Sequence, residues 1–260
     1  MQEALQIARA AGLPPGLVEW HATLGSTNQL LCERVRKGAP HGSLIAAGQQ
    51  SAGRGCGAKP FFSPPEGGAY FSVLLRGCAP APAELPVTPR AALAVRRVLL
   101  AHGVPLGVKW VNDLFRGGRK VCGILCQAVG GTDGVVVGVG LNLYPAVPPP
   151  PELTGIIGFC AGSAAALPPR CQLIGEITGE LLRLCAVRGE QANAALLEEY
   201  RSASILLGRQ VEYLENDCFL PALALDITPA GGLLLQTPNG TTKALTSGTV
   251  RLHSETQQTA

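Results

Sequence analysis

Two apolar runs joined by a glycine-rich turn place the strongest constraint on how this chain folds. Residues 120–128 and 135–143 each have the apolar content of one buried strand, and the turn at 130–134 reads Gly-Gly-Thr-Asp-Gly. Glycine and aspartate suit the backbone of a tight hairpin turn, so the two runs are predicted to pair as neighbouring strands. Helical patterns elsewhere in the chain then predict an α+β fold, in which a mixed sheet is packed with helices.

Local signals predict the other elements of this fold. A hydroxyl of Ser26 or Thr27 can cap a helix over 28–37. Thr88 offers an N-cap hydroxyl and Pro89 suits a first helical position, so a second helix is predicted to start there and run to about residue 100. The remaining predictions are strands at 44–48, 70–75 and 108–110, helices at 172–187 and 191–202, a loop at 78–86 and a rigid extended segment at 148–151.

The character of the chain changes after Gly208. Short apolar runs there alternate with turn signals such as Gly231-Gly232 and Asn239-Gly240, which predicts a compact all-β module of about 50 residues. We therefore expect two domains, a larger one over 1–204 and a small all-β one over 205–260. The strands predicted in the small domain are 211–214, 222–227, 233–236 and 241–245.

Composition excludes several classes of protein. The chain has 260 residues, 47% hydrophobic content and a formal net charge of +3, which allows a sizeable core but not a strongly basic nucleic-acid surface. It has no apolar run long enough for a membrane span, and residues 1–16 lack the zones of a signal peptide. Nine cysteines without paired CxxC spacing suit neither a disulfide framework nor a zinc site. We expect a cytoplasmic protein that binds no membrane and no nucleic acid.

The segment 50–61 is the most suggestive binding motif, and it reads Gln-Ser-Ala-Gly-Arg-Gly-Cys-Gly-Ala-Lys-Pro-Phe. Glycines let the backbone approach a ligand closely. Arg54 carries a planar, permanent charge that suits phosphate or carboxylate, and backbone N–H groups around Gly53 and Gly55 add dipoles that favour an anion. The segment is predicted to be an anion-binding loop, and a flexible surface turn with a solvated arginine is the competing interpretation.

Four further segments become informative beside this loop. They read Gly-Ser-Thr-Asn at 25–28, Val-Lys-Trp-Val-Asn-Asp-Leu at 108–114, Gly-Arg-Lys-Val-Cys-Gly-Ile-Leu at 118–125 and Gly-Val-Gly-Leu-Asn at 138–142. In this order and spacing the motifs resemble those of the biotin protein ligases, and the β module matches the family's C-terminal domain in size and position. The resemblance implies a class II synthetase-like catalytic domain that binds biotin and ATP, followed by an SH3-like β-barrel.

The resemblance also implies an activity and a set of substrate contacts. Members activate biotin with ATP and Mg²⁺ as biotinyl-5′-AMP, then transfer it to a lysine of a biotin carboxyl carrier protein, often that of acetyl-CoA carboxylase. Ser26, Thr27 and Gln50 are neutral hydrogen-bonding groups that suit the uncharged ureido ring of biotin, although the first two could serve only as a helix cap. The implied substrate-binding residues are Ser26, Thr27, Asn28, Gln50, Gly53, Arg54, Gly55, Cys56, Trp110, Lys120, Gly123 and Asn142.

The charged residues receive catalytic and metal-binding roles from the same resemblance. Arg54 would clamp the biotin carboxylate and the α-phosphate, Lys120 would be the main catalytic cation, and Lys109 would assist. Asn112 and Asp113 offer hard oxygen ligands of the kind that Mg²⁺ prefers when it also bridges phosphates. A simple turn after the strand is the competing interpretation of the Asn-Asp pair.

Several positions depart from the family's pattern. Where the family has further arginines and a tryptophan in the loop, this chain has Cys56, Gly57 and Phe61, and Val111 replaces a proline. A missing guanidinium removes a charge-assisted contact of about 1.5 to 3 kcal/mol. We therefore expect the adenylate to be held less tightly than in other members. The Cys56 thiol is either inert or, beside Arg54, reactive through a lowered pKa.

Two other functions are compatible with parts of the sequence. A lipoate ligase or octanoyl transferase shares a related catalytic fold, and a non-catalytic biotin or nucleotide sensor would tolerate the altered loop. The Lys-Trp-x-Asn-Asp motif and the β module favour biotin, and the retained cations favour catalysis. The first motif begins at residue 25, so a form without an N-terminal DNA-binding domain is expected, as a monomer or homodimer. Arg251 and His253 receive no role.

Overall fold

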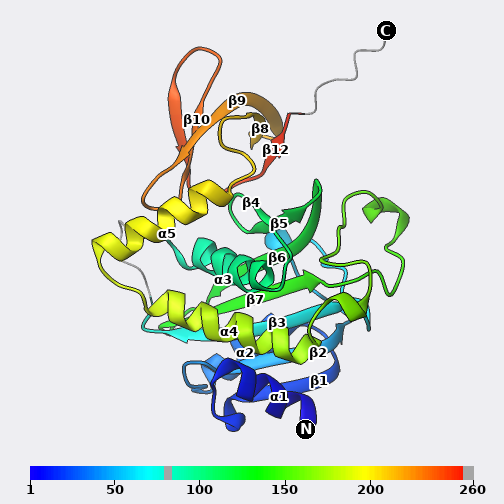
Figure 1. Cartoon of the computed structure of the whole chain (residues 1–260). Coiled ribbons are helices and arrows are strands. Elements are labelled where there is room, and N and C mark those ends of the chain that lie inside the picture. The colour runs from blue at the N-terminus through cyan, green and yellow to red at the C-terminus, as the bar shows by residue number, and fades with distance from the viewer. Residues whose placement is uncertain (79–83, 254–260) are drawn as a thin grey trace.

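The predicted hairpin forms the centre of the larger sheet. In the computed structural model, which describes residues 1–78 and 84–253, β6 (Arg119–Ala128) and β7 (Gly134–Asn142) pair antiparallel. The seven strands have the order β1-β2-β3-β7-β6-β5-β4 (Figure 1). β1 and β2 are parallel and the other pairs antiparallel, so the predicted mixed sheet is confirmed. The remaining strands are β1 (Val18–Leu24), β2 (Leu44–Gln50), β3 (Gly68–Arg76), β4 (Gly107–Lys109) and β5 (Asp113–Arg116).

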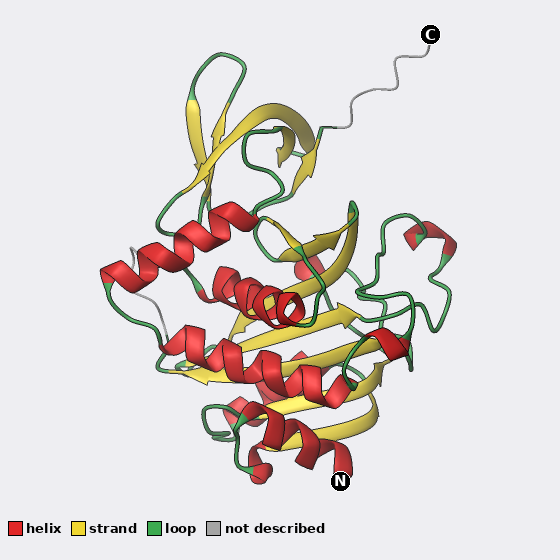
Figure 2. Ribbon diagram, viewed as in Figure 1, coloured by secondary structure: helices red, strands yellow, loops and turns green. Residues whose placement is uncertain are grey.

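Helices cover both faces of this sheet because its strands are apolar on both sides. Neighbouring residues of a strand point to opposite faces, and Val73 and Leu75 of β3 join the larger core whereas Leu74 joins a smaller one. The larger core is covered by α1 (Gln2–Ala11), α3 (Val87–Ala101) and α4 (Arg170–Ala186) (Figure 2). The smaller core lies under α2 (Thr27–Arg36). Within the described residues, no helix is long and apolar enough to cross a membrane.

Two predicted helix caps were wrong. α3 begins at Val87 with Pro86 at its N-cap, so Thr88 lies inside the first turn and does not cap it. Ser26 occupies the N-cap of α2, yet no side-chain cap bond comes from it. The Thr27 N–H is instead bonded by Gln50 at the end of β2, so a residue distant in sequence replaces the local cap. The elements α1, β1 and β5 were not predicted, and residues 79–83 of the predicted loop lie outside the described part of the chain.

The C-terminal strands form a second, five-stranded antiparallel sheet, as the β-module prediction required. Its order is β11-β10-β9-β8-β12, and helix α5 (Glu190–Ala203) precedes it. Inward-facing residues such as Val211 and Leu233 belong to the same hydrophobic core as the residues of the larger sheet. The strands are β8 (Gln210–Glu215), β9 (Cys218–Ile227), β10 (Leu233–Gln236), β11 (Thr242–Leu245) and β12 (Val250–Leu252), the last of which was not predicted.

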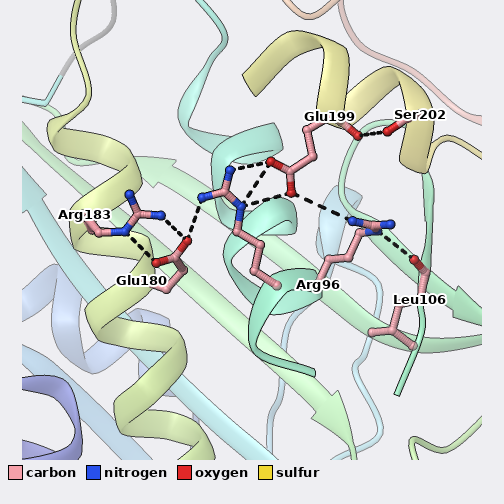
Figure 3. Close-up of polar contacts among 7 residues, drawn as sticks. Arg96, Leu106, Glu180, Arg183, Glu199 and Ser202 are labelled. Atoms are coloured by element: carbon pink, nitrogen blue, oxygen red, sulfur yellow. Dashed lines mark hydrogen bonds and ion pairs between the residues drawn. The ribbon is translucent and has the colours of Figure 1, made fainter. Parts of the chain in front are cut away.

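A chain of ion pairs joins the helices α3, α4 and α5 (Figure 3). Arg97 of α3 lies with its Nη1 2.9 Å from Glu180 Oε1 of α4, and it also pairs with Glu199 of α5. The hydrogen bonds that Arg97 donates to Glu199 and, to a lesser extent, to Glu180 raise its pKa. Arg96 and Arg183 extend the chain at its two ends. Because the pairs are partly buried and share partners, they fix the spacing of α3, α4 and α5 better than isolated surface pairs would.

Candidate active site

A strip of bare backbone on the larger sheet defines the candidate site. Val137, Val139 and Leu141 of β7 point into the larger core, so Gly138 and Gly140 between them lie on the opposite face. Gly140 pairs directly with Gly123 of β6, and the two glycines leave a trough without side chains. This part of β7 therefore alternates large residues toward the core with glycine on the opposite face, which leaves the backbone there free of its own side chains.

The ring of Phe61 lies on this trough. A Cβ atom added to Gly140 would sit 2.4 Å from Phe61 Cε1, and one added to Gly123 would sit 3.0 Å from Phe61 Cε2. Carbon atoms do not approach below 3.0 Å, so Gly140 needs glycine or a displaced ring, whereas at Gly123 a small shift of the ring would be enough. The sequence had marked Phe61 only as a replacement for tryptophan, whereas the structure makes it the roof of the trough.

A polar network closes one end of the trough. Gln50 Oε1 accepts hydrogen bonds from Thr27 N at 2.9 Å and Thr27 Oγ1 at 3.2 Å, and Gln50 Nε2 donates to Ser63 Oγ at 3.0 Å. Ser72 Oγ lies 2.8 Å from Thr27 Oγ1. Ser26 is buried beside them. The predicted neutral groups Ser26, Thr27 and Gln50 are thus brought together, with Ser63 and Ser72 as additional members.

Asn28 belongs to the same end of the trough, and its side chain is engaged by the protein. Its Nδ2 donates to Leu125 O at 3.2 Å and to Gln127 Oε1 at 2.8 Å, while Ser72 Oγ donates to its Oδ1 at 2.5 Å. A Cβ atom at Gly138 would lie 2.0 Å from Asn28 Oδ1. Asn28 therefore packs flat on Gly138 and ties α2 to β3 and β6, which orients the trough rather than leaving a free amide for a ligand.

The anion-binding loop folds back on itself as a short irregular hairpin. Phe61 N donates to Gly53 O at 2.9 Å, and Gly55 N donates to Lys59 O at 2.7 Å. A Cβ atom at Gly53 would lie 2.6 Å from Phe61 O, so the close crossing requires glycine there. Arg54 is exposed and lies opposite Pro60 on one arm of the hairpin, and no ion pair to it is found in the described part of the chain. Its guanidinium is available to an anion that enters beside the trough.

Two lysines and one carboxylate lie at the other end of the trough. Lys120 Nζ lies 2.6 Å from Asp113 Oδ1, and its Cε would be 3.2 Å from a Cβ atom at Gly123. Lys109 of β4 lies directly opposite Asp113 of β5 in the strand register. Burial lowers the pKa of Lys109, Asp113 counteracts this, and Lys120 lowers it further. A single carboxylate thus faces two cations, and the site carries spare positive charge for an anionic ligand.

Cys56 fastens the loop to the sheet near these charges. Asn112 Nδ2 donates to Cys56 Sγ at 3.0 Å and to Ile124 O at 2.8 Å. Burial raises the pKa of the Cys56 thiol and Asp113 adds to the rise, although Lys120 and the bond from Asn112 oppose it. The interpretation of a thiol activated by a lowered pKa was therefore wrong. Cys56 acts as a contact between loop and sheet.

Two of the predicted binding residues make contacts inside the protein. Trp110 is buried, and its Nε1 donates to Gly231 O of the C-terminal module at 2.9 Å. Asn142 is buried at the end of β7, where its Nδ2 lies 3.5 Å from Lys120 O. Arg251 and His253, which had no assigned role, both pair with Glu212 within the small sheet. The structure does not bring these last two into the trough.

The donor set fits a Mg²⁺ ion that arrives with a nucleotide. No cluster of three or more His, Cys, Asp or Glu suited to a metal is found within residues 1–78 and 84–253. Asp113 offers one carboxylate and Asn112 one amide oxygen, because the hydrogen bonds of the Asn112 side chain to Cys56 and Ile124 use its Nδ2. Mg²⁺ commonly takes only one or two protein ligands and fills the rest of its shell with phosphate and water. These two residues suit that arrangement and not a closed protein cage.

Sequence reasoning missed Ser63, Ser72, Gln127 and Gly140. The last three left a signal, because Ser72 and Gln127 are polar residues on apolar strands and Gly140 repeats Gly138 at strand spacing. These residues recur at every second position of a strand, on one face of the sheet. Which face they share can be recognised only once the register of the strands is known.

Solved structures share this fold. A biotin protein ligase from Aquifex aeolicus in complex with biotin and ATP superposes with a TM-score of 0.77 at 23% identity, over 90% of this chain and 98% of that one. A biotin protein ligase from Leishmania major in complex with biotinyl-5-AMP gives a TM-score of 0.61 at 21% identity, over 88% and 98% of the two chains. At these identities the likeness concerns the arrangement of the backbone.

Sequence relatives are similar over different extents. The biotin--[acetyl-CoA-carboxylase] ligase of Mycobacterium tuberculosis is 29% identical over 88% of this chain and 86% of its own length. The bifunctional ligase/repressor BirA of Bacillus subtilis is 33% identical over 48% of this chain, and the match spans only 39% of that relative.

Two family models together match well over half of the chain. The Biotin/lipoate A/B protein ligase family model matches residues 20–142, which hold nearly every residue of the trough. The Biotin protein ligase C terminal domain model matches residues 206–252, which form the second sheet. The first model covers both biotin and lipoate enzymes. The second describes a domain of biotin protein ligases and so favours the biotin enzymes. The chain belongs to the biotin protein ligase family.

Proposed function

We propose that the protein is an ATP-dependent ligase that activates biotin as biotinyl-5′-AMP and transfers it to a lysine of a biotin carboxyl carrier protein. One observation carries the proposal. The trough floored by Gly123 and Gly140 and roofed by Phe61 joins a neutral polar end to a cationic end. Biotin has the matching sequence of groups, an uncharged ureido ring, a thin aliphatic chain and a terminal carboxylate.

The orientation of biotin follows from this match. The ureido ring belongs at Gln50 and Thr27, whose amide and hydroxyl groups can exchange their mutual hydrogen bonds for bonds to the ligand. The aliphatic chain would run over the bare backbone of Gly140, under the ring of Phe61, where apolar contact excludes water. The carboxylate would then reach Lys120 at the far end. Phe61 must shift to admit the chain.

Activation brings two anions together, so the cations are central to it. A carboxylate oxygen of biotin attacks the α-phosphorus of ATP, the bond to the bridging oxygen of the β-phosphate breaks, and pyrophosphate leaves. Lys120 and Arg54 would offset the charge that gathers on the α-phosphoryl oxygens. Asp113 and Asn112 would hold the Mg²⁺ that accompanies ATP, which neutralises charge on the departing pyrophosphate.

Transfer follows without further energy input. The neutral amine of the carrier lysine attacks the acyl carbon of the adenylate, an amide bond forms and AMP leaves. The loop at 50–61, fastened by Cys56 to Asn112, would cover the mixed anhydride and reduce its hydrolysis.

The partner and the setting of the reaction extend the proposal. The names of the Mycobacterium tuberculosis and Paracoccus denitrificans relatives support a carrier domain of acetyl-CoA carboxylase as the acceptor. All nine cysteines are free thiols, which supports a reducing compartment such as the cytoplasm. A monomer or homodimer without affinity for nucleic acid stays a prediction, to be checked by light scattering and by gel shift.

One assay separates the proposal from its alternatives. Purified protein is incubated with ATP and Mg²⁺ plus biotin, lipoate or no acid, and pyrophosphate release is followed. The proposal expects release with biotin alone and, on addition of a carrier domain, one biotin on one lysine by mass spectrometry. Release with lipoate but not biotin would support the lipoate alternative, and release with neither acid would support a sensor. Either outcome overturns the proposal.

A further inference from the structure

The turn that carries Asn112 is held from outside the trough by two buried side chains. Trp110 Nε1 donates to Gly231 O of the C-terminal module at 2.9 Å. Tyr200 of α5 is fully buried, and its hydroxyl donates to Val111 O at 3.1 Å. Neither donor is needed for the strand pairing of β4 with β5. Each satisfies a carbonyl that would otherwise be buried or half-buried without a partner.

The same turn is fixed to the site on its inner side. Ile124 N donates to Asn112 O at 3.0 Å, and Asn112 Nδ2 returns a bond to Ile124 O at 2.8 Å. The next residue, Asp113, lies beside Gly123 in register and holds Lys120. The turn at 110–112 therefore has the C-terminal module and α5 on one side and the charged end of the trough on the other.

Gly231 is itself wedged in place. Its φ is +77°, and a Cβ atom there would lie 2.8 Å from Pro86 Cδ at the start of α3. The carbonyl that receives the Trp110 indole is thus fixed by packing against the larger domain, and it can serve as a rigid anchor.

We propose that Tyr200 and Trp110 are positioning residues, through which α5 and the C-terminal module hold Asn112 and Asp113 in register with Lys120 for adenylate formation. Trp110 then acts as a clamp across the two sheets and not as a contact for the ligand. This inference rests on the proposed function for its kinetic consequence, but the clamp itself is a structural statement that can be tested without turnover.

The test uses two tyrosines that differ in what their hydroxyls hold. Tyr200→Phe removes the bond to Val111, and Tyr213→Phe removes a hydroxyl from an equally buried ring whose partner is Glu215, within the small sheet. Amide hydrogen exchange is followed at Ile124, which reports the turn, and at Leu74, which donates to Ser43 O in the large sheet and reports global opening. Pyrophosphate release gives kcat and the KM for biotin.

In Tyr200→Phe, we expect exchange at Ile124 to rise about tenfold and kcat to fall about tenfold, as one lost net hydrogen bond allows. Exchange at Leu74 and the KM for biotin should stay within about twofold, because Gln50 and Thr27, the proposed contacts of the ureido ring, lie at the opposite end of the trough from the turn. Tyr213→Phe should change none of the four quantities, and Trp110→Phe, which keeps an aromatic ring but loses the indole N–H, should repeat the result of Tyr200→Phe.

Several outcomes would overturn the inference. These are unchanged exchange at Ile124 in both clamp variants, an equal rise at Ile124 and Leu74, or the same effects in Tyr213→Phe. If the wild-type protein releases no pyrophosphate with any acid, the proposed function fails, while exchange at Ile124 still decides the clamp. Should Tyr200→Phe not fold, Trp110→Phe supplies the same measurements.

Discussion

The Lys120 ammonium lies 2.6 Å from the Asp113 carboxylate, so the main cation of the site is neutralised before any ligand enters. An incoming carboxylate or phosphate must share Lys120 with Asp113, and Mg²⁺ bound by Asp113 would release the lysine. If the proposed function holds, the pair would couple the binding of the metal–nucleotide complex to the release of Lys120.

The first prediction concerns Lys120 itself. Lys120→Met keeps the length of the aliphatic chain and removes the charge, so we expect the rate of pyrophosphate release to fall about 10²- to 10³-fold. Lys37→Met, at the exposed C-cap of α2, removes a positive charge away from the trough and should leave the rate unchanged. Equal rates in Lys120→Met and the wild type would remove Lys120 from the mechanism.

The second prediction concerns the floor of the trough. Gly140→Ala would place a Cβ atom 2.4 Å from Phe61 Cε1, so the ring must move. We expect the KM for biotin to rise about tenfold or more with little change in the KM for ATP, because only the aliphatic channel narrows. Gly130→Ala is the matched control, since nothing lies within 4 Å of its added Cβ atom.

A second substitution sharpens this test. Phe61→Ala removes the ring that a methyl group at Gly140 would strike, so the double variant should tolerate the methyl group better than the single variant does. Strictly additive effects of the two substitutions on the KM for biotin would show that Phe61 and Gly140 do not meet in the working enzyme.

The third prediction concerns the cysteine of the loop. Cys56→Arg restores a guanidinium near the adenylate, and one charge-assisted contact of about 1.5 to 3 kcal/mol corresponds to about ten- to hundredfold slower loss of the intermediate. Dissociation of biotinyl-5′-AMP and biotinylation of added free amines are measured together, and both should decrease. Cys218→Arg, at an exposed cysteine of the small sheet, controls for added charge. Unchanged dissociation in Cys56→Arg would contradict the idea of weak retention.

The fourth prediction follows from the protonation of the same thiol. Its pKa is raised, chiefly by burial, so the protonated form persists above the usual range. Alkylation of Cys56 by iodoacetamide should therefore be slow at neutral pH and accelerate only in the alkaline range, since the thiolate is the reactive form. Peptide mapping with a Cys56→Ser control identifies the site, and rapid labelling at pH 7 would refute the prediction.

The fifth prediction concerns the stability contributed by Lys109. Burial lowers the pKa of Lys109 in the folded protein, so the unfolded chain binds more protons between that lowered value and the ordinary value of about 10.5. The free energy of unfolding should rise with pH through this window, since the cost of a buried charge is full below it and is relieved above it.

Replacement of Lys109 provides the measurement. Lys109→Met should unfold at a higher urea concentration than the wild type at pH 7 and lose part of the rise toward alkaline pH, while its adenylation rate falls. Lys37→Met should show neither change in the urea midpoint. A Lys109→Met variant that is less stable than the wild type at pH 7 would show that its contacts with Asp113 and Phe115 outweigh the cost of burial.

The larger architecture could be predicted from the sequence because its signals are local. The hairpin of β6 and β7 is marked by apolar runs and a glycine turn, and the small sheet by regularly spaced turns. The start of α3 was misplaced because a Thr-Pro pair is a local signal that packing of Val87 into the core overrode. Strand β5 is only four residues long, too short for a pattern to stand out.

Within the candidate site, residue types were predictable and contacts were not. The neutral and charged groups could be identified from motifs, but the partner of each depends on register between strands distant in sequence. Gln50, which replaces Ser26 as the cap of α2, lies 23 residues along the chain from the Thr27 N–H that it binds. Trp110 and its partner Gly231 are 121 residues apart in the sequence. No local pattern reports such pairings, so Trp110 was assigned to the ligand and Tyr200 was not noticed.

The hydrophobic core that runs without a break from the large sheet into the small one sets a limit on how this molecule can be rebuilt. The strands before and after residue 205 belong to two different sheets. Residues on the two sides of this point, such as Tyr200 and Val211, nevertheless belong to one hydrophobic core. A chimaera that exchanges the small sheet with that of a relative would have to carry over the facing surface of α5 as well. The two sheets are expected to melt in one transition, so the boundary near 205 is a poor site for recombination.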